Sequence, residues 1–453
     1  MKTPTLIATG LMLSAFGWAS GNEKYEVWAI DQSNSPGKAY GGTIYIWDGH
    51  ELENKQKHAM AEKVDLGEAV STLCMAETGA NPVRPHMLTM NASNTHAIIS
   101  FVASGHVLFM NAESRQPVRC IRTSIGSTGV RQVHQSFPAP DETYVGVANQ
   151  NGKLFERINT NYVTETFTLD VAAKVDLATC TTPNGLPCES ALLRPDNAPI
   201  CPIIDSSSTL NFVTLRGGGL FVINGKTTPM QIVAEYDKST IHPNGCLGAE
   251  VGNKMYIDSG GGTALNLYEA DLYAFPLGPG VYSPANGPNL PVRKLVFSED
   301  VESADTHGAA LTKHNKYLWI ADRGRNFVFV VDTATDFVVN RINLLPSLQS
   351  AKLTAKGARV YHSDGDHLSD DPTPDLLFLS PNGEHMFMTL RGPNPLTADP
   401  HVSTGALPGV GVLKITEGGR NGVFESVAPM SKIDAGGVER ADAHALWVRS
   451  KRN

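Results

Sequence analysis

The sequence has little charge, few aromatic residues and none of several short motifs that mark common enzyme classes. Of its 453 residues, 18% are charged and 7% are aromatic, and the net charge is −8. No basic run is present, so a nucleic-acid partner is disfavoured. The absence of GxSxG, P-loop, HExxH, CxxCH and CxxC sequences argues against a nucleophile elbow, a phosphate-cradling loop, a zincin, attached haem and a zinc ribbon.

Long apolar runs are also missing, except at the N-terminus, so no membrane span is expected. Residues 1–21 contain Lys2, an apolar run from Leu6 to Trp18 and then three small residues. This pattern is typical of a signal peptide cleaved near Gly21, and the run is short for the alternative, an anchor helix. We therefore expect a periplasmic or secreted protein whose mature domain spans residues 22–453.

Cysteine is scarce, but the cysteines form an even set. They occupy positions 74, 120, 180, 188, 201 and 246. In an exported chain such a set predicts disulfide bonds. Cys180 and Cys188 flank a stretch with Pro and Gly and could close a small loop, whereas the sequence alone leaves the full pairing open.

Glycine and proline are abundant and leave little room for long helices. The 42 glycines and 28 prolines favour many short strands separated by turns. The clearest example is a stretch of four expected strands: one that opens at Thr306, then Tyr317–Ala321, Phe327–Val331 and Phe337–Ile342. Four antiparallel strands in so short a stretch are typical of one blade of a β-propeller.

The same pattern recurs along the chain and predicts an all-β fold, a single seven-bladed β-propeller. Other blades are expected to begin near Pro85, Val133, Pro199, His242 and Thr373. The N-terminal strands lack a first strand, and residues 442–450 form a lone strand at the other end. We expect this C-terminal strand to join the N-terminal blade and close the ring, which removes two exposed edges. A sandwich or jelly roll is the alternative, but it does not explain turns at near-regular spacing.

The start of each innermost propeller strand lies at one mouth of the central channel. Aligning the blades by their turns places four histidines and one aspartate, Asp375, at this position. The histidines are His86, His134, His307 and His444. Crowded imidazoles would repel one another when protonated, whereas a metal binds them neutral. Imidazole-rich sites suit copper, zinc, iron and nickel. For any single histidine, the alternative is a hydrogen bond to a neighbouring blade.

Three Arg-Gly pairs are expected at the same mouth. Arg216, Arg323 and Arg391 end second strands, and these ends lie at the same face as the starts of the first strands. Their guanidinium groups could hold an anionic substrate, or they could bridge to acidic neighbours between blades.

Acidic residues near the axial histidines are candidates for supporting roles. Asp305 and Asp442 each precede an axial histidine by two residues, so they could orient an imidazole. The segment from Tyr361 to Asp375, rich in His and Asp, enters at the same face. It could add ligands or a general base, or it could be a solvated acidic loop.

The blades resemble the YVTN-repeat group of seven-bladed propellers, as in SPNGEHMFMTL from Ser380 and LWIADRGRNFVFVVDT from Leu318. This repeat-level resemblance implies the fold and says little about chemistry. With its axial histidines, the chain also resembles the copper propeller domains of nitrous oxide reductase and thiocyanate dehydrogenase. It lacks the copper-binding cupredoxin domain of the former.

These features favour an exported metal-dependent enzyme, with an oxidoreductase preferred over a hydrolase. The expected cofactor is a metal ion, copper by the resemblance, held by His86, His134, His307 and His444. The expected catalytic residues are His134, His307 and Asp375. The expected ligands of a small anionic or polar substrate are Arg216, Arg323 and Arg391. A redox protein is a further expected partner.

Two other functions stay open. A non-catalytic propeller would bind a protein or a cell-envelope ligand through its loops, and its axial histidines would lie too far apart to share an ion. A lactonase-type or lyase-type enzyme would use an axial histidine as a general base. Its activity would survive removal of metals, unlike that of a metal-dependent enzyme.

Overall fold

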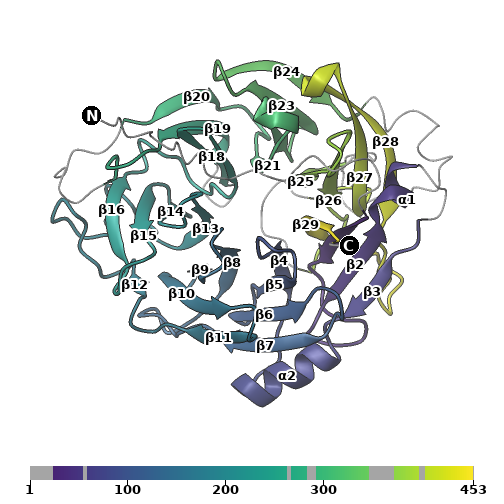
Figure 1. Cartoon of the computed structure of the whole chain (residues 1–453), viewed down its shortest axis with the longest axis horizontal. Helices are drawn as coiled ribbons and strands as arrows, with labels where there is room; N and C mark the ends of the chain where they lie inside the picture. Colours follow the sequence, from purple (N-terminus) through teal and green to yellow (C-terminus); the bar gives the residue numbers. More distant parts are fainter. Residues whose placement is uncertain are drawn as a thin grey trace, which may run out of the picture.

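The computed structural model describes residues 24–54, 59–262, 267–282, 292–345, 372–396 and 404–451. Its strands form seven antiparallel sheets around a central axis (Figure 1). The predicted all-β, seven-bladed propeller is confirmed. The predicted signal peptide, residues 1–21, lies outside the described residues.

The seven blades follow one another around the ring in chain order. Blade one comprises β29 (Ala443–Ser450), β1 (Tyr25–Asp31), β2 (Thr43–Asp48) and β3 (Glu62–Asp65). Blade two comprises β4 (Pro85–Met90), β5 (His96–Phe101), β6 (His106–Asn111) and β7 (Pro117–Arg122). Blade three comprises β8 (Val133–Pro138), β9 (Tyr144–Asn149), β10 (Leu154–Asn161) and β11 (Thr166–Leu169), with β12 (Val175–Asp176) paired to β10.

The remaining blades repeat the same order from inner to outer strand. Blade four comprises β13 (Pro199–Ile204), β14 (Leu210–Leu215), β15 (Leu220–Asn224) and β16 (Gln231–Tyr236). Blade five comprises β17 (Gly248–Val251), β18 (Lys254–Gly262), β19 (Leu267–Pro276) and β20 (Lys294–Glu299). Blade six comprises β21 (Thr306–Leu311), β22 (Tyr317–Asp322), β23 (Phe327–Asp332) and β24 (Phe337–Asn343). Blade seven comprises β25 (Pro374–Leu379), β26 (His385–Leu390), β27 (Gly409–Thr416) and β28 (Asn421–Pro429).

The ring closes where the two ends of the chain meet, as the sequence predicted. β29 pairs antiparallel with β1, with Trp447 opposite Trp28 and Ser450 opposite Tyr25. In Figure 1 the yellow C-terminal strand lies beside the purple N-terminal strands. The pairing covers the edge of β1 that β2 leaves open and makes β29 the innermost strand of blade one.

The core lies between neighbouring blades, where their apolar faces stack. All six residues of β22 are buried, whereas β24, the outermost strand of the same blade, is partly exposed. One buried cluster joins Trp28 and Trp47 of blade one to Leu88 of blade two and Phe387 of blade seven. Such inter-blade packing explains why the inner strands are apolar on both faces and do not alternate strictly.

Inner and second strands are joined by a recurring turn. In the SPNG turn, the Gly383 N–H donates to the Ser380 carbonyl at 2.9 Å, and in the APDE turn Glu142 donates to Ala139 at the same distance. The fourth residue has a positive φ in both, +74° at Gly383 and +62° at Glu142. The sequence therefore placed the two turns correctly.

Helices are few in the described residues: α1 (Gly49–Glu53), α2 (Ala69–Thr78) and the short 3₁₀ turns η3 (Lys313–Asn315) and η4 (Glu417–Gly419). The sequence patterns did not predict α2. It ends at Gly79, whose φ of +72° is the left-handed conformation that closes many helices. No described helix is long and apolar enough to cross a membrane.

All six cysteines form disulfides, which confirms the predicted class of bond. Cys180 pairs with Cys188, as the small loop indicated. Cys74–Cys120 ties α2 to β7 of blade two, and Cys201–Cys246 ties the inner edges of blades four and five. Three disulfides are consistent with an oxidising compartment.

The ring closure also contains a buried ion-pair network centred on Glu26. Its carboxylate contacts Arg449 at 3.0 Å, Arg115 at 2.6 Å and Lys451 at 2.6 Å, joining β1, β29 and blade two. Burial opposes ionisation of Glu26, but its hydrogen bonds to Lys451, Arg115 and Trp28 outweigh burial and lower its pKa to about 2.

We predict that Glu26→Gln lowers the free energy of unfolding at pH 7 by about 3 kcal/mol, as expected for a pKa lowered by about two units. A lowered carboxyl pKa stabilises the fold above the unfolded value of about 4.3, and this stabilisation is lost as pH falls through the folded value. The difference between variant and wild type, measured by urea unfolding, should therefore shrink between pH 4 and pH 2. Glu113→Gln, which removes an exposed partner of the same Arg449, is the control and should cost less than about 1 kcal/mol. A difference that does not change with pH would contradict this role for Glu26.

Candidate functional site

The axial side chains are positioned by an irregularity that recurs at the start of the inner strands. In blades two and three the pairing with the second strand skips His86 and His134. Equivalent shifts occur around His307, Asp375 and His444. A β-bulge lets a residue leave the hydrogen-bonded ladder and re-aims its side chain. The bulges explain how residues within strands present side chains to the channel.

His86 and His134 face each other across the boundary between blades two and three. Their Nε2 atoms are 3.2 Å apart, and their rings meet nearly edge to face, with centroids 4.4 Å apart. Both residues are buried. The sequence predicted that these two histidines come together, and they do.

Asp375 connects the other two axial histidines. Its Oδ1 is 2.5 Å from His307 Nδ1, and its Oδ2 is 2.6 Å from His444 Nδ1. Arg391 Nη1 donates to the same Oδ2 at 3.0 Å. This fully buried carboxylate therefore joins the inner strands of blades six, seven and one.

The four imidazoles form one continuous row. The rings of His86 and His444 stack with centroids 4.2 Å apart, and those of His444 and His307 stack at 5.2 Å, each pair within 28° of parallel. The order along the row is His134, His86, His444, His307. All four histidines expected at the mouth are thus in contact with at least one other.

Hydrogen bonds on one side of the rings select a tautomer for most of the row. His86 Nδ1 lies 2.5 Å from Gln32 Oε1, and the Nδ1 atoms of His307 and His444 face Asp375. Since these oxygens are acceptors, each Nδ1 carries the proton and each Nε2 carries a lone pair. His444 Nε2 is buried and has no hydrogen-bond partner. Metal-binding histidines characteristically hold their second nitrogen in this way.

Burial disfavours the charged forms of two of these imidazoles, His86 and His307. It lowers the pKa of His86 and of His307 well below the usual range, and the nearby positive charges of Arg391 and Arg323 act in the same direction. Burial opposes ionisation of Asp375, but the attraction of its histidine and arginine neighbours outweighs it and holds the pKa of this carboxyl well below the usual range. The centre thus places the neutral imidazole of His307 beside an ionised carboxylate.

Arg323 and Arg391 lie beside Asp375, each held by a second carboxylate. Arg391 binds Asp442 through Nε and Nη2 at 2.7 and 2.8 Å. Arg323 binds Asp305 through the same two atoms at 2.9 and 2.8 Å, and its Nη1 is 3.7 Å from Asp375 Oδ1. The expectation that Asp305 and Asp442 orient imidazoles was wrong, because these carboxylates bind the guanidinium groups and Asp375 and Gln32 contact the histidines.

Arg216 does not join this group. Its side chain is 40% exposed and bridges Asp196 at 2.5 Å and Asn151 at 2.9 Å. The structure thus separates three arginines that the Arg-Gly pattern treated as equivalent. Blades six and seven turn theirs toward Asp375, whereas blade four uses its arginine to bridge to blade three.

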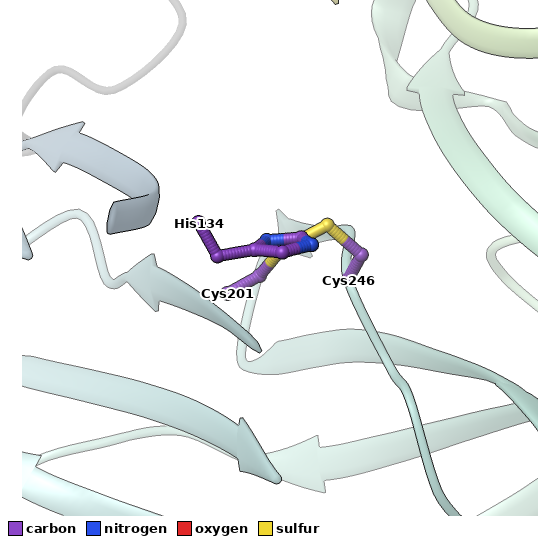
Figure 2. Close-up of side chains that lie close together, drawn as sticks. All are labelled: His134, Cys201 and Cys246. Carbon is purple, nitrogen blue, oxygen red and sulfur yellow. A yellow bond between two sulfur atoms is a disulfide. The ribbon is translucent and has the colours of Figure 1, made fainter. Parts of the chain in front are cut away.

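Sequence reasoning missed two neighbours of the row. Gln32 follows β1, the second strand of blade one, and so takes the position that Arg323 and Arg391 take in their blades. The repeat alignment could have found it, had it been extended beyond Arg-Gly pairs. The second is the Cys201–Cys246 disulfide: Cys201 Sγ lies 3.7 Å from His134 Nδ1 (Figure 2).

The described residues contain three groups of at least three His, Cys, Asp or Glu whose ligand atoms lie within 4.8 Å of one another. These are His134 with Cys201 and Cys246; His307 with Asp375 and His444; and His242 with Glu269 and Asp271. The first contains the disulfide, whose sulfurs are not thiolate ligands. None of these three groups contains three axial histidines. The row instead consists of two pairs: His86 faces His134, and Asp375 bridges His307 and His444. The segment 361–371, expected to enter this face, lies outside the described residues.

Comparisons with solved structures agree with the fold. The chain is similar to a protein from Lactobacillus plantarum (TM-score 0.56, 9% identity, covering 94% of this chain and 99% of that one). It is also similar to a periplasmic gluconolactonase from Pseudomonas aeruginosa (0.55, 12%, 94% and 99%) and a putative 6-phosphogluconolactonase from Bacteroides fragilis (0.54, 11%, 95% and 99%). No family model and no curated protein matches the sequence. At these identities the likeness shows the propeller fold alone.

The contrast between the arginines allows a direct test. Arg391→Met should leave Asp442 buried without its cation and Asp375 with only Arg323, and it should lower the free energy of unfolding by about 3–5 kcal/mol. Arg216→Met removes a partly exposed ion pair and should cost less than about 1 kcal/mol. Chemical unfolding of the two variants measures both values. Equal losses would contradict the distinction between a buried Arg391 that holds the centre together and a peripheral Arg216.

Proposed function

We propose that the axial histidines hold a redox-active metal ion, copper in particular, and that the protein is an exported metal-dependent oxidoreductase. The observation that carries this proposal is the row of four buried imidazoles at one repeat position of the propeller. Three of them direct Nδ1 to an acceptor oxygen and thereby present Nε2 as a donor for a metal.

The facing pair has a spacing that suits a shared ion. Bonds of about 2.0–2.1 Å to one ion in tetrahedral geometry place two nitrogens about 3.3 Å apart. His86 Nε2 and His134 Nε2 are 3.2 Å apart. These two residues would provide the first ligands, and His444, stacked on His86 with an unpartnered Nε2, would be the next. His307 lies at the far end of the row from His134. All four histidines could therefore bind one ion only if the rings moved toward it, and without such movement the row would hold more than one ion.

The charges around the row also favour a cation. Three carboxylates, those of Asp305, Asp375 and Asp442, face two guanidinium groups, those of Arg323 and Arg391. These five groups together carry one negative charge in excess, and the positive charge of Arg84 acts at the other end, on His86. A bound cation would offset the excess negative charge, and imidazole ligands suit copper among the candidate metals. The resemblance of the sequence to YVTN-repeat propellers and to copper propeller enzymes is a further reason to propose copper.

The residues around the ion have distinct roles in this proposal. Copper would supply one-electron transfer with a redox partner protein. Asp375 holds the Nδ1 proton of His307 and leaves the lone pair on Nε2. This nitrogen would either ligate the ion or, with the ion held by the other three imidazoles, accept a proton from a bound substrate. Asp375 and His307, together with His134, are the proposed catalytic residues. Arg323 and Arg391 are the proposed contacts of a small anionic or polar substrate, once a bound cation offsets the carboxylates beside them. Arg216, which bridges to blade three, is no longer part of this set.

Hydrolysis without a metal is the second candidate. The 2.5 Å contact between His307 Nδ1 and Asp375 forms a carboxylate–imidazole pair, the arrangement of a general base. Two similar structures are described as lactonases. A lactonase would use His307 to activate water, and its activity would survive chelation. The third candidate, a non-catalytic binding protein, predicts separated histidines, and the 3.2 Å contact of His86 and His134 argues against it.

The proposal is tested by metal analysis of protein isolated from the periplasm. Wild-type protein should contain stoichiometric copper, and the double variant His134→Ala, His307→Ala should lose most of it because it removes one ligand from each pair. His96→Ala is the matched control, since His96 is buried but bound to Thr95 and Glu165 in blades two and three. It should retain the wild-type metal content.

Equal, near-zero metal in the wild type and the double variant, even after the purified protein is incubated with copper, would overturn the metal proposal. Lactone hydrolysis that persists after chelation and is abolished by Asp375→Asn would then support the second candidate. Copper retained by the double variant at the wild-type level would also overturn the proposal, because the ion would lie elsewhere.

A further inference from the structure

A second cluster of metal-ligating side chains lies in blade five, outside the axial row. His242 precedes β17, and Glu269 and Asp271 lie on β19. His242 Nδ1 is 2.7 Å from Asp271 Oδ2 and 3.0 Å from Glu269 Oε2. These ligand atoms lie within 4.8 Å of one another. The cluster shares no residue with the axial row.

The carboxylates of Glu269 and Asp271 are buried, and His242 alone does not satisfy all of their oxygens. Asp271 is 0% exposed and Glu269 is 8% exposed. His242 Nδ1 has one hydrogen, which it donates to Asp271, and Tyr273 donates to the same oxygen at 3.2 Å. Glu269 Oε2 points at the same nitrogen but accepts no hydrogen bond, and Asp271 Oδ1 is also buried without a donor. Unpaired buried carboxylate oxygens are costly, so a cation that binds these two oxygens would stabilise the cluster.

We propose that His242, Glu269 and Asp271 bind a divalent transition-metal cation of the zinc or manganese type. One neutral imidazole and two carboxylates balance a charge of +2, and this mixture of nitrogen and oxygen ligands suits Zn²⁺ and Mn²⁺ better than Ca²⁺, which takes oxygen ligands. The His242 side chain is 36% exposed, so an ion can reach the cluster from solvent.

A histidine in another blade shows that the fold does not generally bring two carboxylates to the same imidazole nitrogen. His385, in blade seven, also has two carboxylate neighbours. Glu53 lies 3.3 Å from its Nδ1 and Glu425 lies 3.7 Å from its Nε2. Because these carboxylates meet opposite ring nitrogens, they cannot converge with the imidazole on one ion. The blade-five cluster, in contrast, brings both carboxylates to the same nitrogen.

The position of the cluster indicates what the ion would do. It would join β19 to the segment that carries His242 and leads to Cys246, at the entrance to blade five. Glu269 also forms an isolated β-bridge with Asp305, whose carboxylate holds Arg323 of the axial centre. An ion at the cluster would therefore stabilise the blade-five side of the channel mouth, whether or not the axial histidines hold a metal of their own.

The test uses full mature protein from which a chelator has removed all metal. The protein is titrated with Mn²⁺ alone, and the electron paramagnetic resonance signal measures the Mn²⁺ that stays free. The titration is carried out in the His134→Ala, His307→Ala background, which removes axial ligands. This protein should bind one equivalent of Mn²⁺, compete for it with Zn²⁺, and gain thermal stability with metal concentration by mass action. Adding Glu269→Gln should lower the affinity at least tenfold, whereas Glu425→Gln should leave it unchanged.

No binding at millimolar Mn²⁺ or Zn²⁺, or equal affinity with and without Glu269→Gln, would overturn the proposal. His242→Gln is a second variant for the case in which Glu269→Gln does not fold, because His242 is only half-buried. It should remove the nitrogen coupling from the pulsed resonance spectrum of bound Mn²⁺, and retention of that coupling would count against His242 as a ligand. The axial proposal can fail without affecting these results.

Discussion

The mouth of the channel depends on one buried carboxylate. Asp375 contacts His307 and His444 through separate oxygens and also receives Arg391. These contacts join blades six, seven and one at the channel mouth. Because a buried carboxylate is costly unless it is surrounded by donors, the positions of its partners are tightly constrained. The same ionised group fixes the protons on two imidazoles, so the inter-blade contact also determines which ring nitrogens are available for chemistry.

A second constraint is the bulge at the start of the inner strands. A regular strand would direct alternate residues into the packed interface between blades, whereas the skipped pairing at His86, His134 and their equivalents frees those residues to face the axis. The repeat therefore provides a ring of positions whose side chains can vary without disturbing the inter-blade core. In this chain the variation is largely between imidazole and carboxylate, with Cys201 of blade four in a disulfide beside His134.

The fold was largely predictable from sequence because it depends on local patterns that repeat. Turn spacing located the blades, and the unmatched strands at the two ends located the closure. The convergence of the axial histidines followed from their common repeat position. The arginines were harder, since Arg216 and Arg391 share a local sequence but differ in burial and partners. Which carboxylate binds which cation depends on the packing of neighbouring blades, and the helix α2 was missed because its ten residues have only a narrow buried face, Val70, Ser71 and Cys74.

The proposed function depends above all on the axial histidines binding a metal through Nε2. Anomalous diffraction from crystals of the copper-treated protein, measured on both sides of the copper absorption edge, tests this most directly. We predict a copper peak about 2.0–2.1 Å from Nε2 of both His86 and His134, a distance typical of metal–imidazole bonds. A map without such a peak, in which those two nitrogens remain in direct contact as a hydrogen-bonded pair, would contradict it.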